Sequence, residues 1–401
     1  MNLYISNSKC NLHDNGHDHP EIAERLNRIQ DQLISNQLFD WFKHADSRAA
    51  TNDELALAHH PELVLALEQK EPEKGVIDVG EDLHLSPGSV LAARHSVGAV
   101  LDGIDAVHSG AAKRVFCNVR PPGHHAGYDK PEGFCFFNNV AVGAAYAIEK
   151  YGYERVAIVD FDVHHGNGTE DYARREPRVW FASSFEDKIY PNSEPESDIP
   201  NMVKMPLDKF SGSKEFRQAW SEKGLPALVK FKPQLILISA GFDGHVLDPM
   251  ANLKLHENDY AWITAELANI ADEFADGKMV SVLEGGYDLG ALSMSAREHI
   301  KTLFDLHFWS RFLIEHWPKK TCSIGRFFWV FFYVNKNYRY VVIERTRQNQ
   351  KNPLLSQFVL LSTNWFLILA VQLERCHWLT SCSSMEEGWI CFQKSDRASV
   401  L

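Results

Sequence analysis

Cysteine is scarce in this chain of 401 residues, and the seven that occur follow no regular spacing. A secreted protein held together by disulfides carries a closely spaced even set, so we expect reduced thiols instead. A long apolar stretch is also missing. The two main apolar runs, Phe327–Val334 and Phe358–Val371, fall short of the ~18 uninterrupted residues of a membrane span, the second because Ser362, Thr363 and Asn364 break it. We therefore expect a globular protein with no membrane span.

Basic residues are fewer than acidic ones, 41 Lys and Arg against 53 Asp and Glu, which gives a formal charge of −12. A general nucleic-acid binder normally has a basic surface, so this class is not expected. The segment Met1–Cys10 has no basic region followed by an apolar stretch, the pattern of a signal peptide. These absences together predict a cytoplasmic protein that binds no nucleic acid, and they leave its oligomeric state open.

The composition changes near residue 305. Residues 305–401 hold twelve Lys or Arg against seven Asp or Glu, and they contain six of the ten tryptophans. Their apolar pattern is irregular. We expect one domain over residues 1–304 and an atypical C-terminal extension over residues 305–401. The extension could bind a partner or a membrane surface, or it could be an out-of-frame addition with little function.

Short apolar runs alternate with helical patterns in residues 1–304. The runs are apolar nearly throughout, which is typical of strands buried on both faces of a sheet. Such alternation predicts the α/β class, with a mainly parallel sheet covered by helices, and functional loops at the carboxyl ends of the strands. The predicted strands are Arg114–Asn118, Arg155–Asp160, Arg178–Ser183, Gln234–Ala240 and Met279–Leu283, and the predicted helices are Asn138–Tyr151, Lys214–Lys230, Glu257–Ala275 and Leu289–Leu303.

The sequence DFDVHHGNG, residues 160–168, follows one predicted strand. Asp160, Asp162 and His164 alternate, so in an extended segment their side chains share one face. Carboxylates and imidazoles are good ligands for a metal such as Zn²⁺. The alternative is a polar loop whose side chains only cap nearby backbone groups.

The sequence SAGFDGHVLDP, residues 239–249, follows a second predicted strand. An aspartate directly after a strand, such as Asp243, is most often a turn former. Together with the first group, however, Asp243 becomes a natural third metal ligand. Three protein ligands leave one position open for water or substrate, as a catalytic zinc requires.

Two further strand ends carry possible acid–base groups. The loop RPPGHHAG, residues 120–127, holds adjacent histidines, His124 and His125, and an imidazole can transfer protons near neutral pH. The sequence LEGGYD, residues 283–288, places Tyr287 where its phenol could donate to a developing oxyanion. Either could also be an ordinary surface loop.

The motifs RPPGHHA, EGFCFFNN, DFDVHHGNGT, SAGFDGHVLDP and EGGYD, in this order and spacing, resemble the histone deacetylase family. HPEIAERL and LSPGS are similar to it as well, so the likeness covers roughly residues 13–303. It leans toward class II members and toward bacterial deacetylase-like and acetylpolyamine amidohydrolase relatives. The resemblance implies the arginase–deacetylase fold, a three-layer α/β/α arrangement around a mainly parallel sheet.

The resemblance also implies roles for the polar residues at the strand ends. A zinc ion would be held by Asp162, His164 and Asp243. His125, paired with Asn167, would act as general base and then as general acid. His124, paired with Asp160, would be its electrostatic partner, and Tyr287 would polarise the scissile carbonyl.

Substrate contacts follow from the same resemblance. Phe134, next to Gly133, would line a narrow channel for an acyl-lysine side chain, and Asp82 would hold the substrate at the rim. Arg25 would lie in a cavity behind the metal. Phe185 and the segment 191–193, Pro-Asn-Ser, depart from the family pattern. They leave the second channel wall, and with it the acyl-chain preference, open.

A structural monovalent cation, normally K⁺, is implied at Asp160, Asp162, His164 and the segment 183–184. The function implied is a zinc-dependent deacetylase acting on an acetylated protein or a small acetylated amine, and an acetylpolyamine amidohydrolase is the alternative. A catalytically silent binding protein is a second alternative. A binuclear manganese enzyme of the arginase branch is disfavoured because Gly244 and His245 follow Asp243 where that branch has a further aspartate.

Overall fold

The computed structural model describes residues 1–80 and 82–306, together with the backbone of 329–334, 339–344, 358–363 and 366–371. The chain divides into two compact units, Met1–Glu315 and His316–Leu401. The predicted extension over residues 305–401 lies largely outside the described residues. Within it, two antiparallel pairs are described, β11 (Trp329–Val334) with β12 (Arg339–Glu344), and β13 (Phe358–Thr363) with β14 (Phe366–Val371).

The first unit is built around one eight-stranded sheet, in the order β2-β1-β5-β10-β9-β6-β7-β8, in which all neighbours run parallel. Its strands are β1 (Asn2–Ser6), β2 (Lys43–Asp46), β5 (Arg114–Asn118), β6 (Val156–Asp160), β7 (Val179–Glu186), β8 (Met202–Leu207), β9 (Leu235–Ala240) and β10 (Met279–Leu283). A short antiparallel pair, β3 (Ile77–Gly80) and β4 (Leu83–Leu85), lies apart from the sheet.

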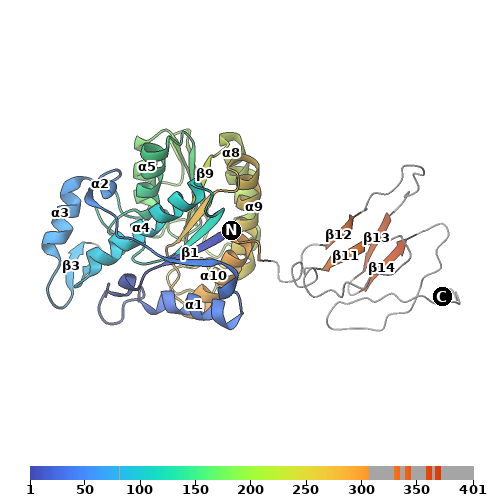
Figure 1. The fold of residues 1–401 in the computed structure, drawn as a ribbon, viewed down its shortest axis with the longest axis horizontal. Coiled ribbons are helices and arrows are strands. Elements are labelled where there is room, and N and C mark those ends of the chain that lie inside the picture. The colour runs from blue at the N-terminus through green and yellow to red at the C-terminus, as the bar shows by residue number, and fades with distance from the viewer. Residues whose placement is uncertain (81, 307–328, 335–338, 345–357, 364–365, 372–401) are drawn as a thin grey trace. The chain divides into compact units, whose positions relative to one another are not determined.

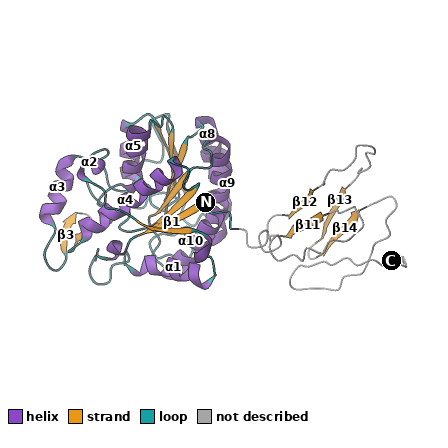
Figure 2. Ribbon diagram, viewed as in Figure 1, coloured by secondary structure: helices purple, strands orange, loops and turns teal. Residues whose placement is uncertain are grey.

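Helices cover the sheet on both sides (Figure 1), with α4 packed against α5 and α9 packed against α10. Figure 2 shows the strands enclosed between these helical layers. The helices are α1 (Glu24–Ser35), α2 (Asn52–Leu55), α3 (Pro61–Lys70), α4 (Ser89–His108), α5 (Asn139–Tyr151), α6 (Asn167–Arg175), α7 (Ser213–Ala219), α8 (Leu225–Phe231), α9 (Glu257–Phe274) and α10 (Leu289–Leu303). This confirms the predicted α/β class and the three-layer arrangement around a parallel sheet.

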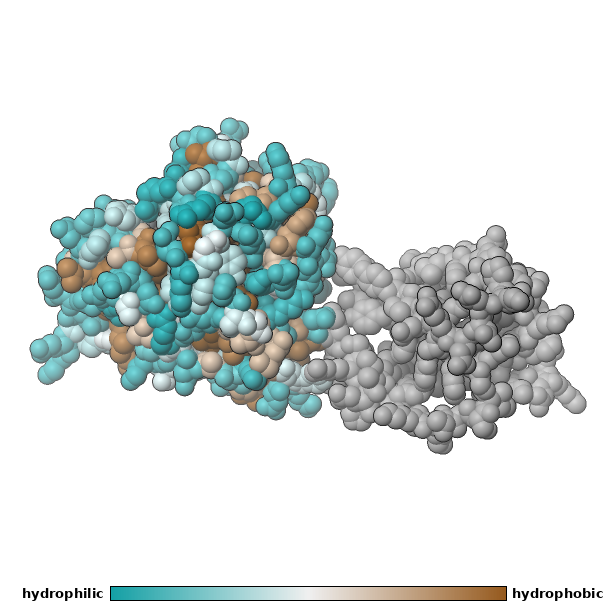
Figure 3. Space-filling model, turned by 45° about the horizontal axis from the view of Figure 1, so that its top comes forward, coloured by the Kyte–Doolittle hydropathy of each residue, from teal (hydrophilic) through white to brown (hydrophobic). Residues whose placement is uncertain are grey.

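The central strands are buried along their whole length. Every residue of β5, β6, β9 and β10 is buried, as the uninterrupted apolar runs of the sequence require. The predicted strands are found with shifts at their ends, the largest being the extension of β7 to Glu186. Polar residues cover most of the coloured surface in Figure 3, where apolar residues form small separate groups.

The predicted helical stretch Lys214–Lys230 is found, but it is not one regular α-helix. The structure has α7, a π-helical turn at Trp220–Gly224, and then α8. Pro226 in the first turn of α8 has no backbone N–H to continue the regular ladder. The N–H of Leu225 instead reaches back five residues to the carbonyl of Trp220, which is the spacing of a π-turn.

None of the helices in the described part of the chain is both long enough and apolar enough to cross a membrane.

The order of the strands in the sheet has a direct consequence for the site. Strands β5, β10, β9 and β6 are consecutive neighbours and run in the same direction. The loops that follow them therefore leave the same edge of the sheet side by side.

Candidate active site

The four loops at this edge carry the polar residues singled out in the sequence. The loop after β5 holds His124 and His125, and the loop after β6 holds Asp162 and His164. The loops after β9 and β10 add one residue each, Asp243 and Tyr287. The parallel sheet thus brings together residues that are up to 163 positions apart in the chain.

Asp162, His164 and Asp243 form a compact group, because one potential ligand atom of each lies within 4.8 Å of the others. The Nδ1 atom of His164 is 3.1 Å from a carboxylate oxygen of Asp162 and 3.1 Å from one of Asp243. All three residues are buried. Asp162 is further oriented by the N–H of Gly285, at 2.8 Å, and Asp243 by the N–H of Val163, at 3.0 Å.

This donor set fits a divalent cation better than it fits hydrogen bonds alone. An imidazole nitrogen carries at most one hydrogen, so Nδ1 of His164 cannot donate to both carboxylates. Burial and the negative charge of Asp162 raise the pKa of the Asp243 carboxyl more than the neighbouring His164 lowers it, so the two acids favour additional positive charge between them. A cation among the three residues removes both conflicts, and carboxylate oxygens and imidazole nitrogens are suitable ligands.

His124 pairs with a carboxylate. Its Nδ1 atom lies 3.0 Å from Oδ2 of Asp160, and both residues are buried. Burial opposes a charged imidazole, but the charges of Asp162 and Asp160 outweigh it and raise the pKa of His124 to about 10. The backbone N–H groups of Gly123 and His124 donate to Glu284, at 2.6 and 3.2 Å, and this fixes the path of the histidine loop.

His125 pairs with an amide instead. Its Nδ1 atom lies 2.7 Å from Oδ1 of Asn167, the first residue of α6. The Nδ2 atom of Asn167 donates to the carboxylate of Glu132, so the amide oxygen must face the histidine. Nδ1 of His125 then donates the hydrogen, which leaves the lone pair on Nε2. Burial, together with the positive charges of His124 and His164, lowers the pKa of His125 well below its usual value.

Tyr287 is held by two groups that the sequence motifs did not connect to it. The backbone N–H groups of Tyr287 and Asp288 donate to Asp248, at 2.6 and 3.0 Å. Arg25 is fully buried, its guanidinium carbon lies 5.0 Å from the centre of the tyrosine ring, and its Nε donates to the carbonyl of Gly286 at 2.7 Å. Burial and the charge of Asp243 raise the pKa of the Tyr287 hydroxyl, which therefore stays protonated and can donate.

A narrow cavity of about 80 Å³ reaches these residues, and its lining brings together most of the predicted site. Gly133 and Phe134 form one wall, both with a positive φ, of 57° and 66°. A Cβ atom at Gly133 would lie 2.7 Å from Cδ2 of His125 and 2.8 Å from the hydroxyl of Tyr190. The position therefore needs glycine for space as well as for conformation. The lining residues are Asp82, Pro122, His124, His125, Gly133, Phe134, His164, Tyr190, Met250 and Tyr287.

The second wall, which the sequence left open, is Tyr190. Its ring centre lies 5.0 Å from that of His125, edge to face. Phe185 is not part of the lining, because it is buried against His165 with ring centres 4.8 Å apart. The signal that could have found Tyr190 is its place just before Pro191, in the loop that follows β7 at the same edge of the sheet. Met250, on the loop after β9, was missed as well.

Asp82 lies at the exposed rim of this cavity, where its backbone carbonyl accepts the N–H of Phe134 at 3.1 Å.

The residues predicted to hold a monovalent cation also lie near one another. Asp160 is on the last position of β6, opposite Ser183 of β7, and the Ser183 hydroxyl is buried without a hydrogen-bond partner in the described part of the chain.

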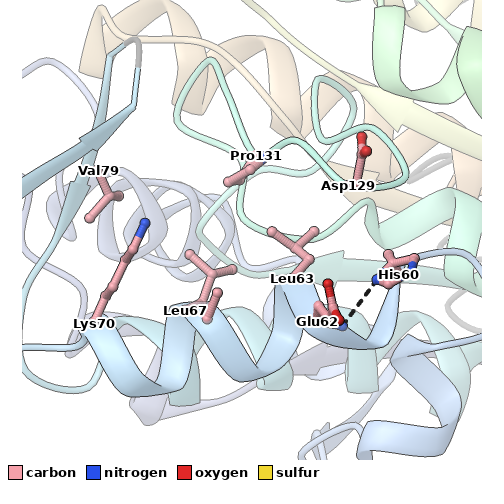
Figure 4. Close-up of a pocket in the computed structure, with 9 residues that line it drawn as sticks. His60, Glu62, Leu63, Leu67, Lys70, Val79, Asp129 and Pro131 are labelled. Atoms are coloured by element: carbon pink, nitrogen blue, oxygen red, sulfur yellow. Dashed lines mark hydrogen bonds between the residues drawn. The ribbon is translucent and has the colours of Figure 1, made fainter.

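A larger cavity, of about 390 Å³, contains none of the predicted site residues. It lies between α3, β3 and the segment around Pro131 (Figure 4). Leu63 and Leu67 of α3 line it, while the charged side chains around it, Glu62, Lys70 and Asp129, are exposed. It has no convergent buried polar groups, so the smaller cavity is the better candidate for chemistry.

Comparison with known proteins identifies the family of this chain. Residues 19–303 match the family described as the histone deacetylase domain. The chain is 35% identical to a histone deacetylase-like amidohydrolase of Pseudomonas aeruginosa, over 67% of this chain and 72% of that protein. It is 40% identical to type-2 histone deacetylase 2 of Dictyostelium discoideum, over 56% of this chain, a match that spans only 14% of that much longer protein.

A solved structure is also similar to this chain. The crystal structure of the HDA15 HD domain superposes with a TM-score of 0.71 at 31% sequence identity, covering 76% of this chain and 89% of that one. At this identity the likeness concerns the family as well as the fold.

Proposed function

This chain belongs to the histone deacetylase family of deacetylases and amidohydrolases, and from that membership we propose that it is a zinc-dependent deacetylase. The proposed substrate is the acetyl amide of an acetyl-lysine side chain or of a related acylated amine. The proposed catalytic domain is residues 1–304, and residues 305–401 are proposed to be an extension without catalytic residues. We propose that the protein acts in the cytoplasm and binds no nucleic acid.

The observation that carries the proposal is the buried group of Asp162, His164 and Asp243, of which His164 lines the narrow cavity. These three residues would hold the zinc ion. When bound, zinc supplies Lewis acidity, which polarises an amide carbonyl and makes an attacking water more acidic. Two carboxylates and one imidazole leave a coordination position for these groups.

His125 is proposed to move the proton. Its Nε2 atom carries the lone pair, since Nδ1 donates to Asn167, and His125 lines the cavity. It can accept a proton from the attacking water and then give it to the leaving amine. His124, with Asp160 behind it, would supply positive charge next to the reacting atoms. The two adjacent histidines thus receive different tasks because their partners differ in charge.

Tyr287 is proposed to donate a hydrogen bond to the carbonyl oxygen as negative charge develops on it. Its hydroxyl is protonated, and its backbone is fixed through Asp248 while Arg25 packs over its ring. A preorganised donor of this kind needs no rearrangement during the reaction. Its contribution is therefore expected in turnover and not in substrate binding.

The cavity walls suggest how the substrate enters. Phe134 and Tyr190, which line the cavity together with His125, would enclose an unbranched apolar stem. Asp82, exposed at the rim, could accept a hydrogen bond from the substrate backbone or attract a substrate amine. The first contact favours an acetylated protein, and the second favours an acetylpolyamine, which is our alternative.

A structural K⁺ ion is proposed next to the catalytic group, held from Asp160, Asp162, His164 and the segment 183–184. The Ser183 hydroxyl supports this proposal, since it is buried without a hydrogen-bond partner among the described residues, which is unfavourable. A catalytically silent binding protein is the remaining alternative. It would bind acetylated ligands without releasing acetate.

The test combines metal content with a substrate panel. Asp243→Asn keeps the shape of the side chain but weakens metal binding, so zinc and acetate release should both be lost. Asp276→Asn, at an exposed aspartate outside the site, is the control and should change neither. Acetyl-lysine peptides, acetylspermidine and acetylputrescine would be compared by kcat/KM. Full zinc content in Asp243→Asn, or no acetate release from any substrate by the zinc-loaded protein, would contradict the proposal.

A further inference from the structure

A second group of possible metal ligands lies outside the proposed catalytic group. One potential ligand atom from each of His245, His256 and Glu257 lies within 4.8 Å of the others. His245 follows β9, and His256 and Glu257 stand at the start of α9. The two segments are joined by the N–H of Val246, which donates to the carbonyl of Leu255 at 2.9 Å. The group is therefore held together by the backbone.

One ring nitrogen of the buried member of this group lacks a hydrogen bond within the described residues. His245 is only 3% exposed, and its Nε2 atom has no hydrogen-bond partner in the described part of the chain. Nε2 points toward Glu257, with 3.7 Å to Oε1. That separation is too long for a hydrogen bond but suits two ligands of one ion, which each lie about 2 Å from a zinc.

We propose that His245, His256 and Glu257 form a second binding site for a borderline divalent cation such as Zn²⁺. His256 is exposed, so the site opens to solvent and water completes the coordination. The proposal goes beyond the deacetylase function and does not depend on it, because none of the three residues belongs to the proposed catalytic group.

Three features make this site weaker than the proposed catalytic one. It offers one carboxylate instead of two, and it lies at the N-terminus of α9, where the helix dipole disfavours a cation. Binding through Nε2 also requires a hydrogen on Nδ1 of His245, which now accepts the N–H of Leu247 at 3.2 Å. Leu247 is an exposed residue, so a water molecule can accept the hydrogen bond of its N–H when that bond is lost.

The site is connected to the cavity through one loop. The segment between His245 and His256 carries Asp248, which accepts the N–H of Tyr287, and Met250, which lines the cavity. A cation that ties the two ends of this segment together would restrict its motion. Because the ion binds the folded chain, it also stabilises that chain against unfolding.

Zinc titration of the metal-stripped full-length protein, followed by calorimetry, tests the proposal. We expect a tight event and a weaker event in the wild type. His256→Ala and Glu257→Gln should remove the weaker event and keep the tight one. His17→Ala, at an exposed histidine outside the group, is the matched control and should keep both. Any binding by thiols and histidines of residues 305–401 is the same in all these proteins, so the differences between variants carry the result.

Asp243→Asn separates this proposal from the proposed function, since it should remove the tight event and keep the weaker one. Thermal unfolding gives a second readout. Excess zinc should raise the Tm of Asp243→Asn, and adding His256→Ala to it should abolish that rise. A weaker event that persists in both His256→Ala and Glu257→Gln, or a wild-type protein that binds one ion only, would overturn the second site.

Discussion

The Nδ1 atom of His125 lies 2.7 Å from the side-chain oxygen of Asn167, an amide that carries no charge. The neighbouring His124 has the carboxylate of Asp160 at 3.0 Å from its Nδ1. An amide orients an imidazole without stabilising its cation, whereas a carboxylate does both. The pKa of His125 is accordingly lowered and that of His124 is raised. One adjacent pair of histidines thus supplies a neutral base and a positive charge.

This difference predicts unequal effects of removing the two rings. His125→Ala should lower kcat by about 10²-fold or more, because it removes the group that transfers the proton. His124→Ala should be milder, since charge near the reacting atoms is only partly lost. Steady-state kinetics and zinc analysis check both, and zinc should be retained in each. The assigned roles would be wrong if His124→Ala abolished turnover while His125→Ala kept it.

Tyr287→Phe tests the hydroxyl without removing the ring. Because the hydroxyl is proposed to act on charge that develops in the transition state, kcat should fall by about 10²-fold or more. KM should change much less, and zinc content and circular dichroism should match the wild type. A variant with normal kcat and a raised KM would instead assign the hydroxyl to substrate binding.

Gly133→Ala tests the close approach of the channel wall to the catalytic histidine. The added Cβ would meet His125 and Tyr190 at less than 3 Å, so the wall or the ring must shift. We expect at least a tenfold loss of kcat/KM with zinc retained.

Gly110→Ala is the matched control, because Gly110 also has a positive φ, of 75°, but has nothing within 4 Å of an added Cβ. It should cost about 1 kcal/mol of stability, as a left-handed alanine does, and leave kcat/KM unchanged. Equal losses of activity in Gly133→Ala and Gly110→Ala would show that backbone strain, and not the contact with His125, is responsible.

The sequence predicted the central strands well because these are buried on both faces, which leaves an uninterrupted apolar run. Strand β2 has no such run, since all four of its residues, Lys43 to Asp46, are exposed at the edge of the sheet. Strand β8 is interrupted by Lys204 and Pro206. Edge strands have one open side and need not be apolar, so their pattern does not separate them from loops.

The candidate site was predictable where it depends on strand ends and was not where it depends on long loops. Asp162 and Asp243 follow neighbouring strands directly, so their proximity is a consequence of sheet order. Tyr190 lies four residues beyond β7, and Met250 ten residues beyond β9. The path of such loops is set by tertiary contacts, which no local pattern of the sequence records.

A truncated chain tests where the catalytic domain ends. The carbonyls of Leu303 and Phe304 accept hydrogen bonds from Arg114 and Asn2, at 2.9 and 2.7 Å, and Leu306 is buried. Residues 1–306 should therefore keep zinc and kcat/KM, since every proposed catalytic residue precedes Leu306. Residues 1–302, which lack these contacts, should be less stable in urea. Loss of turnover in residues 1–306 with unchanged circular dichroism and zinc content would mean that the extension completes the site.

Acid should lower the free energy of unfolding because it protonates His299 in the unfolded chain. In the folded chain this residue is fully buried between two hydroxyls. Its Nδ1 lies 2.6 Å from Thr264 and its Nε2 2.8 Å from Ser281, and burial lowers its pKa to about 3. The unfolded chain binds this proton near pH 6.5, but the folded chain does not. The contribution of His299 to stability is therefore complete above pH 6.5. It is lost as the pH falls toward 3, by up to about 1.4 kcal/mol per pH unit.

His299→Gln removes the titrating group while keeping a side chain that can hydrogen-bond to both hydroxyls. In urea unfolding at pH 6.5, 5.5 and 4.5, the free energy of unfolding should fall less steeply with acid in this variant than in the wild type. The difference between the two slopes should correspond to the uptake of about one proton on unfolding. Some slope should remain, because burial also lowers the pKa values of His13 and His59, to about 4. Equal slopes in the wild type and His299→Gln would mean that His299 is protonated in the folded state.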